Sequence, residues 1–287
     1  MTETTGKGTG VQVRHQGAVL LLTLDGPESR NAIGPEVYRR IQACIIEAGR
    51  DPAVRAVVLT GAGGFFSSGG NVNALRDSAR LSLAEVTGNT DGLNAMIKAV
   101  VDSPTPVIAA IEGGAAGAGL SLALACDLIV AAEQARFTVA HVRVGLSPDG
   151  GATHFLRAAL PRQLVMELCL LGQPVTAERL AQAGVVNSVV PAGEALAAAM
   201  AMAERVAQGP PRAIGTIKGL VDGAPSHDLA THLDLEARAI NLARFGAEAA
   251  EGLAAFLEKR RPAFGAAADT ESPPAGALQR GTSWQAG

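Results

Sequence analysis

Short apolar, β-branched runs alternate with amphipathic patterns along most of the chain. Strands are expected where such runs end at glycine or aspartate, and helices where apolar residues recur every three or four positions. The predicted strands are 17–25, 53–61, 105–113 and a strand pair within 127–140, and the predicted helices between them are 35–51 and 118–127. This alternation of strands and helices indicates an α/β fold.

The pattern becomes mostly helical from residue 177 onward. The predicted helices of this part are 194–208, 210–223, 227–245 and 247–262. They predict a helical C-terminal third that packs on the α/β core or on a neighbouring subunit. We expect a core at 11–205, a helical region at 206–264, and flexible tails at 1–10 and 265–287, because the tails are rich in Gly, Ala, Ser, Thr and Pro.

Composition limits the possible partners. With 287 residues, of which 48% are hydrophobic, the chain can bury a large core. Its net charge of −3 arises from evenly scattered residues, 24 basic and 27 acidic, and offers no basic surface for nucleic acid. No signal peptide or membrane span is apparent, so we expect a soluble, cytoplasmic protein. Cys44, Cys126 and Cys169 lie in apolar surroundings and are expected to be buried thiols.

Two glycine-rich clusters follow predicted strands. The first is 63–71 (GGFFSSGGN), and the second, 111–127 (IEGGAAGAGLSLALACD), leads directly into a helix. The start of a helix presents unpaired N–H groups, so two such turns could place two backbone donors on one oxygen, as in an oxyanion hole. The alternative is that both clusters are only tight turns with close helix packing.

Other common glycine motifs are missing from the sequence. It contains no GxxxxGK[ST], no GxGxxG followed by a suitably spaced acidic residue, and no GxSxG. No metal is expected, because His15, His154, His227 and His232 show no metal-ligand spacing among them.

Five separated segments resemble the enoyl-CoA hydratase/isomerase (crotonase) family in order and spacing. They are VLLLTLDGPESRNAIGPEV, GAGGFFSSGGNV, TPVIAAIEGGAAGAGLSLALACDLIVAAEQARF, VGLSPDGGATHFLRAALPR and AFLEKRRPAF, and the resemblance extends over about residues 11–264. It implies a spiral of ββα turns with a C-terminal trimerisation region, assembled as a homotrimer or a dimer of trimers. It also implies an acyl-CoA thioester substrate, with no cofactor beyond the coenzyme A of that substrate.

The resemblance also implies roles for individual residues. The N–H groups of Gly70 and Ala118 match the two oxyanion donors of the family. The positions expected to contact the substrate and its coenzyme A are Ser29, Arg30, Ser68, Ser121, His141, Lys259 and Phe264. Lys259 has an alternative interpretation as a solvated charge at a helix end.

The departures from the family pattern concern the acid–base residues. Hydratases of this family use two glutamates, and the matching positions here are Ser121 and His141. The motif VGLSPDGG instead supplies Asp149, as in members that isomerise double bonds, and the ring-opening epoxyphenylacetyl-CoA isomerase branch is the most similar. One carboxylate with a pKa raised by an apolar surrounding could move a proton between two carbons.

These observations favour an acyl-CoA isomerase with Asp149 as its catalytic base. The alternatives are an enoyl-CoA hydratase and a non-catalytic acyl-CoA-binding protein. Asp149 could instead form a turn or cap the following helix, and His141 could be a second acid, a donor to the substrate, or simply a buried histidine. The segment 71–94 is expected to be a loop that shapes the acyl pocket.

Overall fold

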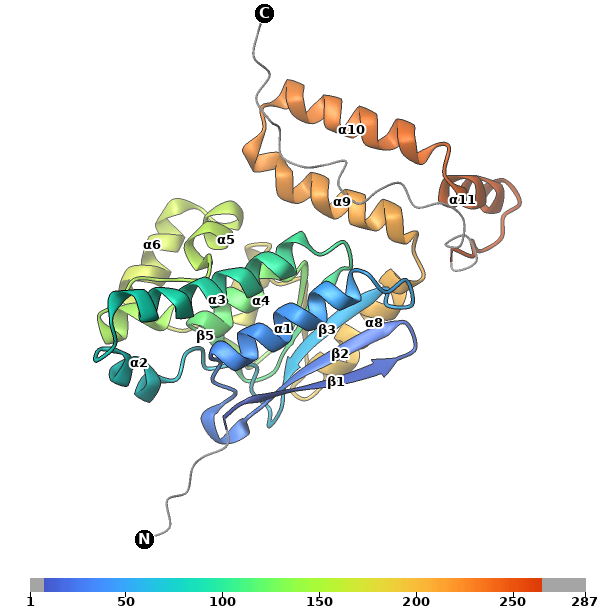
Figure 1. Cartoon of the computed structure of the whole chain (residues 1–287). Coiled ribbons are helices and arrows are strands. Elements are labelled where there is room, and N and C mark those ends of the chain that lie inside the picture. The colour runs from blue at the N-terminus through green and yellow to red at the C-terminus, as the bar shows by residue number, and fades with distance from the viewer. Residues whose placement is uncertain (1–7, 265–287) are drawn as a thin grey trace, which may run out of the picture.

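The computed structural model describes residues 8–264, in which two sheets and a set of helices form the core (Figure 1). The larger sheet has six strands in the order β1-β2-β3-β4-β6-β9, and only β1 and β2 pair in antiparallel fashion. Its strands are β1 (Gly10–Gln16), β2 (Val19–Asp25), β3 (Ala56–Gly61), β4 (Val107–Ile111), β6 (Leu128–Ala132) and β9 (Ser188–Val190). The smaller sheet contains β5 (Gly114–Ala116), β7 (Arg136–Thr138) and β8 (Val175–Thr176).

The chain passes repeatedly from the larger sheet to the smaller one. After β4 it enters β5 and then helix α4 (Ala118–Ala125), and after β6 it enters β7 and then the short helix η2 (Ala140–Val144). The two strands expected within 127–140 are therefore present, but they lie in different sheets and do not pair with each other. This repeat of strand, strand and helix is the spiral expected from the sequence.

Helices cover both faces of the larger sheet. Alternate residues of β2 point to opposite sides, with Leu22 on the side of α1 (Pro35–Ala48) and α3 (Leu83–Asp102) and Leu21 on the side of α8 (Ala195–Ala207). The first side holds the larger apolar cluster, and on the second side α8 packs through its alanines. The remaining elements of the core are η1 (Pro27–Ser29), α2 (Val72–Ser78), α5 (Ala152–Ala159), α6 (Arg162–Leu171) and α7 (Ala177–Gln182).

One prediction in the N-terminal half is wrong, and one strand there was not predicted. The segment 71–94 is not a loop, because it forms α2 and the first half of α3. A capping box starts α3, in which the Ser82 side chain accepts from the Glu85 N–H and the Glu85 side chain accepts from the Ser82 N–H. A strand that the sequence analysis did not identify is β1, which starts at Gly10.

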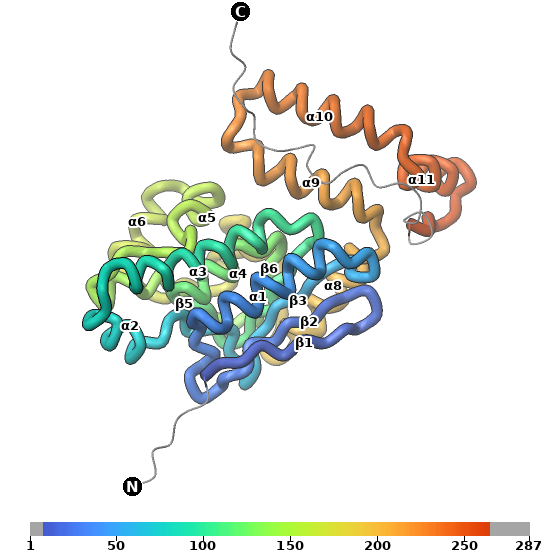
Figure 2. The backbone as a smooth tube through the Cα atoms, in the orientation of Figure 1, coloured from blue at the N-terminus to red at the C-terminus, as the bar shows by residue number. Residues whose placement is uncertain are grey.

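The C-terminal helices project away from the core (Figures 1 and 2). They are α9 (Pro211–Gly223), α10 (Leu229–Ala243) and α11 (Ala247–Leu257), with the short helix η3 (Ala224–Ser226) after α9. Most of the expected helical positions are therefore present. The expected flexible tails fall largely on residues 1–7 and 265–287, which lie outside the described residues.

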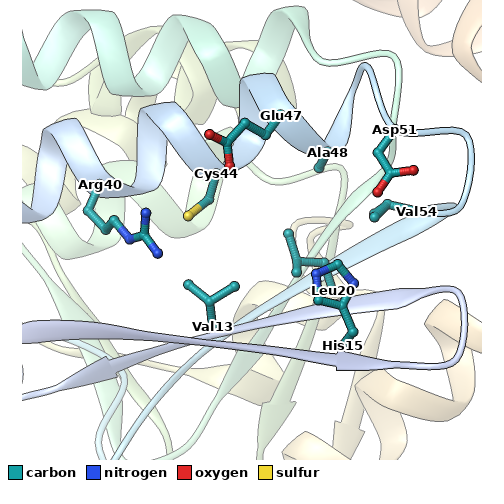
Figure 3. Close-up of a pocket in the computed structure, with 9 residues that line it drawn as sticks. All are labelled: Val13, His15, Leu20, Arg40, Cys44, Glu47, Ala48, Asp51 and Val54. Carbon is teal, nitrogen blue, oxygen red and sulfur yellow. The ribbon is translucent and has the colours of Figure 1, made fainter.

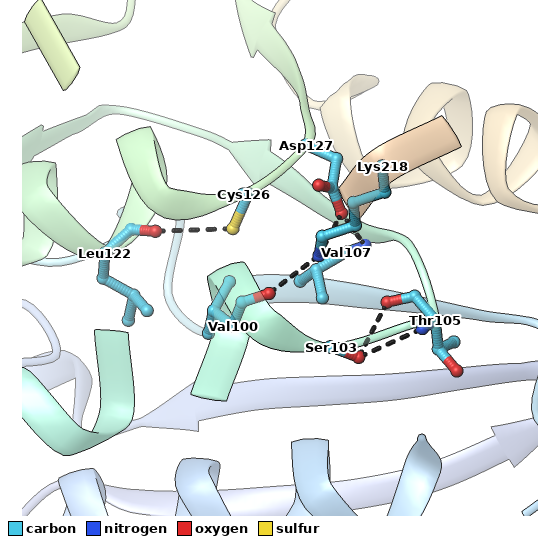
Figure 4. A network of polar contacts seen from close by, with 8 residues as sticks. All are labelled: Val100, Ser103, Thr105, Val107, Leu122, Cys126, Asp127 and Lys218. Carbon is cyan, nitrogen blue, oxygen red and sulfur yellow. Dashed lines mark hydrogen bonds and ion pairs between the residues drawn. The ribbon is translucent and has the colours of Figure 1, made fainter. Parts of the chain in front are cut away.

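A partly buried ion pair joins α9 to the core (Figure 4). The Lys218 side chain is only 8% exposed, and its Nζ donates to the Val100 carbonyl at 2.8 Å and to Asp127 Oδ2 at 3.0 Å. The same carboxylate oxygen accepts the Val107 N–H at 2.7 Å. Burial raises the pKa of Asp127, and the Lys218 charge acts in the opposite direction. This network links α9 to the end of α3 and the start of β4.

Within residues 8–264, no helix combines the length and the apolar character that crossing a membrane requires. The three cysteines are free thiols, and Cys44 and Cys126 are buried as expected, whereas Cys169 is half-buried.

Candidate active site

A buried asparagine holds the glycine-rich loop 63–71 in place. Asn31 is fully buried, its Oδ1 accepts the Gly26 N–H at 2.9 Å, and its Nδ2 donates to the carbonyls of Ala62 at 2.9 Å and Phe65 at 2.6 Å. The Ser67 hydroxyl donates to the Asn31 carbonyl at 2.8 Å. This anchor was not predicted from the sequence, although Asn31 lies within the first of the five family-like segments.

Gly69 brings this loop against the start of α4. Its φ is +88°, and a Cβ placed on it would lie 2.5 Å from the Ala116 carbonyl oxygen and 3.0 Å from the Ala118 nitrogen. Ile33 N–H donates to the Gly69 carbonyl at 2.8 Å and fixes the other side of the loop. Only glycine permits both this φ and this approach, which places Gly70 next to the start of α4.

The two predicted oxyanion donors are unpaired amides. Within the described range 8–264, neither the Gly70 N–H nor the Ala118 N–H has a hydrogen-bond partner. Ala118 is the first residue of α4 and is 6% exposed, so its N–H adds to the positive end of the helix dipole. That the two amides form an oxyanion hole stays a prediction, and their location is compatible with it.

Asp149 and His141 form a pair beside these amides. His141 Nε2 lies 3.1 Å from Asp149 Oδ1, and the side chains are 11% and 39% exposed. A Cβ on Gly117, which precedes α4, would lie 3.9 Å from His141 Nε2. The helix-cap interpretation of Asp149 is wrong, because Gly151 occupies the N-cap of α5, where no side chain caps the helix.

Ser121 supports the backbone of Asp149. Its side chain is fully buried in α4, and its hydroxyl donates to the Asp149 carbonyl at 2.8 Å. Its hydroxyl proton is thus committed to a carbonyl, so Ser121 holds Asp149 in position and does not supply a base.

The hydrogen bonding around His141 indicates its tautomer. Its Nδ1 is buried and has no hydrogen-bond partner among residues 8–264. A lone pair left unpaired at this atom is more easily tolerated than an unpaired N–H, so we assign the ring proton to Nε2. His141 then donates to Asp149 Oδ1.

Tyr38 reaches the same region from α1. The side chain is 8% exposed, and burial raises the pKa of its phenol to about 12, with a further contribution from the negative charge of Asp149. Tyr38 was not among the site residues predicted from the sequence. The available signal was that the only tyrosine of the chain lies on the apolar face of an amphipathic helix, beside Val37 and Ile41.

Three of the expected coenzyme A contacts lie together on the outer side of the glycine loop. The Ser68 N–H donates to the Arg30 carbonyl at 2.8 Å, and the Ser68 hydroxyl donates to the Ser29 carbonyl at 2.9 Å. The Arg30 guanidinium lies 5.6 Å from the centre of the Phe65 ring. Ser29 and Arg30 are exposed, as a contact with a large polar ligand requires, and this role stays a prediction.

Lys259 and Phe264 are not brought to this site within the chain. Both follow α11, which lies apart from α4 and the glycine loop (Figure 1). Lys259 is exposed, and the Phe264 ring packs near Gly252 of α11, where an added Cβ would lie 3.5 Å from it. A contact with coenzyme A bound to a neighbouring subunit stays a prediction for both residues.

A surface hollow between α1 and the first two strands is a separate feature (Figure 3). None of the predicted site residues lines it. Its lining residues are Val13, His15, Leu20, Arg40, Cys44, Glu47, Ala48, Asp51 and Val54. Across the part of the chain that the structure describes, no group of three or more His, Cys, Asp or Glu residues is arranged to hold a metal ion.

Comparison with known proteins places this arrangement in a family. The sequence profile described as Enoyl-CoA hydratase/isomerase matches residues 14–267. The chain belongs to the enoyl-CoA hydratase/isomerase family. The resemblance noted in the sequence is therefore confirmed.

Relatives within the enoyl-CoA hydratase/isomerase family differ in their named activities. The 1,2-epoxyphenylacetyl-CoA isomerase of Escherichia coli K12 is 34% identical over 247 residues, which are 86% of this chain and 94% of that protein. The 2,3-dehydroadipyl-CoA hydratase of the same organism is 33% identical over 253 residues, which are 88% of this chain and 97% of that protein.

Solved structures of the family confirm the crotonase-type fold. The crystal structure of an enoyl-CoA hydratase from Polaromonas sp. JS666 has a TM-score of 0.87 and 42% identity, and it covers 88% of this chain and 98% of its own. This family membership makes the protein an enzyme of acyl-CoA thioester chemistry, at the level of hydratase or isomerase.

Proposed function

We propose that this protein is an acyl-CoA isomerase that forms a thioester enolate and moves a proton with one carboxylate. The observation that supports this is the position of Asp149, whose partly exposed carboxylate is held by His141 beside the unpaired amides of Gly70 and Ala118. An ionisable base next to two backbone donors is what proton removal beside a thioester carbonyl requires.

The reaction begins with the thioester oxygen accepting the two amide hydrogens. Asp149 removes a proton from the acyl group, the C–H electrons become the enolate, and its negative charge collects on that oxygen. Returning the same proton to a different carbon shifts the double bond without net gain or loss of atoms. Losing one such donor raises the barrier by about 3 kcal/mol.

His141 has a positioning role in this proposal. With its proton on Nε2, it binds Asp149 Oδ1 and leaves Oδ2 free to take the substrate proton. Ser121 fixes the same residue through its carbonyl. His141 thus restrains the carboxylate and Ser121 restrains the backbone that carries it, which favours one approach to the substrate.

Water addition is the second candidate activity. It is supported by the similarity to the Polaromonas enoyl-CoA hydratase, which is 42% identical to this chain. In this alternative the His141–Asp149 pair would activate water, since the Ser121 hydroxyl already donates to a carbonyl. A non-catalytic acyl-CoA-binding role is the third alternative, although binding alone does not need a carboxylate beside the two amides.

The exposed apolar residues of the C-terminal helices support assembly. Ile217 of α9 is 58% exposed, Phe245 after α10 is 92% exposed, and Phe256 of α11 is 82% exposed. Such side chains are typical of an interface between subunits. We therefore also propose a homotrimer or a dimer of trimers in the cytoplasm that uses no cofactor besides the coenzyme A of its substrate.

A panel of acyl-CoA thioesters in D₂O tests the proposed reaction. It contains 2-enoyl, 3-enoyl and arylacetyl thioesters, and mass spectrometry follows double-bond migration and deuterium uptake by wild type, Asp149→Asn and Glu178→Gln, whose side chain is exposed on α7. We expect Asp149→Asn alone to lower the rate, by at least about 100-fold. Water addition that survives in Asp149→Asn would refute both the proposed isomerase activity and the role of Asp149 as its base. Tight binding of the thioesters without either reaction would support a binding role.

A further inference from the structure

The Tyr38 side chain lies where α1, α3 and the loop carrying Asp149 meet. A Cβ added to Gly92 of α3 would lie 3.7 Å from the Tyr38 ring. The next residue of α3, Leu93, lies 3.3 Å from a Cβ built on Gly150, which follows Asp149. Tyr38 and the Asp149 loop thus pack against adjacent residues of the same helix.

The Tyr38 hydroxyl has no hydrogen-bond partner among the residues that the structure describes, although the side chain is only 8% exposed. It is also not one of the fully enclosed polar atoms that lack a partner, so it borders space that solvent can reach. By contrast, the buried hydroxyl of Thr60 in β3 donates to the Ala110 carbonyl at 3.0 Å. The phenol oxygen therefore contributes no bond that supports the fold.

Tyr38 and Asp149 affect each other without a hydrogen bond between them. Tyr38 packs near Gly92 and the residue after Asp149 packs near Leu93, which places the two in the same region of α3, and the Asp149 charge contributes to the raised pKa of the phenol. The one hydrogen bond of the Asp149 carboxylate within residues 8–264 joins Oδ1 to His141, so Oδ2 is also free. The phenol O–H and Asp149 Oδ2 are therefore both available to a third group.

We propose that Tyr38 is a specificity-determining residue, whose hydroxyl donates a hydrogen bond to an oxygen atom on the acyl group close to the carbon that Asp149 deprotonates. This inference rests on the proposed enolate chemistry. The favoured substrates are thioesters whose acyl group carries a hydroxyl, ether or keto oxygen. A purely hydrocarbon acyl group would displace water from the phenol and leave its O–H unpaired, which weakens binding.

The test compares phenylacetyl-CoA with its 2-, 3- and 4-hydroxyphenyl derivatives. Exchange of the α-hydrogens in D₂O gives kcat/KM, and calorimetry gives Kd, for wild type, Tyr38→Phe and Thr60→Val. We expect the kcat/KM of wild type for at least one hydroxylated thioester to be about 10- to 100-fold higher than for phenylacetyl-CoA. Tyr38→Phe should remove that preference, with kcat/KM for phenylacetyl-CoA equal to or higher than in wild type because no O–H is left unpaired, whereas Thr60→Val should keep the preference.

Thermal unfolding separates this role from a structural one. We expect Tyr38→Phe to keep or raise Tm, because it removes an unpartnered oxygen, and Thr60→Val to lower Tm, because it breaks a buried hydrogen bond. A lowered Tm for Tyr38→Phe, or an equal loss of kcat/KM on all four thioesters, would overturn the proposal.

The outcome for the proposed function is read independently. If no thioester exchanges its α-hydrogens and Asp149→Asn does not change the rate, the isomerase proposal fails. The role of Tyr38 in binding is then tested by the Kd values alone. A hydroxylated thioester that binds wild type about 10-fold more tightly than Tyr38→Phe still supports the inference, and equal Kd values overturn it.

Discussion

Replacing Gly69 by alanine tests whether close contact between two backbone segments creates the site. The new Cβ would lie 2.5 Å from the Ala116 carbonyl oxygen and 3.0 Å from the Ala118 nitrogen. Both contacts are with backbone atoms, which cannot rotate away as a side chain can. The loop must therefore withdraw from the start of α4, and the Gly70 amide moves with it.

The same loop offers a matched control at Gly64. Its φ is +73°, similar to the +88° of Gly69, and an added Cβ would meet nothing within 4 Å. Both alanine variants should lose about 1–2 kcal/mol of stability from backbone strain. Only Gly69→Ala should also lose activity, by about 100- to 1000-fold in kcat, because one donor no longer reaches the thioester oxygen.

Deuterium exchange measures this difference in activity, and thermal unfolding shows whether each variant is folded. If folded Gly69→Ala kept a kcat within about 3-fold of Gly64→Ala, the approach of Gly69 to Ala118 would not be needed for catalysis. The assignment of Gly70 and Ala118 as paired donors would then be refuted.

Two further predictions concern buried ionisable groups. Lys218→Met should lower the free energy of unfolding by about 2 kcal/mol, because it removes the cation from the partly buried Asp127 carboxylate, and adding Asp127→Asn should recover part of that loss in urea unfolding. Burial raises the pKa of Tyr38 from 10.0 to about 12, so between these pH values the native phenol keeps its proton and the unfolded one loses it. The contribution of Tyr38 to the free energy of unfolding should therefore be fully present below pH 10 and fall by about 2–3 kcal/mol between pH 10 and pH 12. As the chain has one tyrosine, absorbance at the phenolate band follows Tyr38 alone, and Asp149→Asn should move its titration to lower pH; an unchanged titration would contradict their proximity.

The fold could be predicted where burial produces a clear pattern of apolar residues along the chain. The strand β3 is almost fully buried and reads as a continuous apolar run, and α1 shows its apolar face at three- and four-residue spacing. Prediction failed where elements are solvated. In β1 no residue is fully buried, and the first part of α3 is mostly exposed, so apolar periodicity is weak in both. The capping-box residues Ser82 and Glu85 were the local signal that could have identified α3.

The site could be predicted in its residue types but less well in its contacts. The glycine clusters and Asp149 stand out in the sequence because each lies next to a turn. The pairing of His141 with Asp149 and the approach of Tyr38 depend on how distant segments pack, and no spacing along the chain encodes them. The role of Asn31 could not be predicted for the same reason, because the carbonyls of Ala62 and Phe65 that accept its hydrogen bonds are 31 and 34 residues away along the chain.

Packing also couples the residue at position 121 to the position of the base. A Cβ added to Gly150 would lie 2.9 Å from the Ser121 Cβ, and the Ser121 hydroxyl donates to the Asp149 carbonyl. A long acidic side chain at 121 would need the space that this loop occupies and would remove the bond that holds it. A carboxylate on α4 and a carboxylate at 149 in its present place therefore exclude each other in this chain. The small, buried serine at 121 leaves the space that the loop carrying Asp149 occupies and supplies the hydrogen bond that holds it.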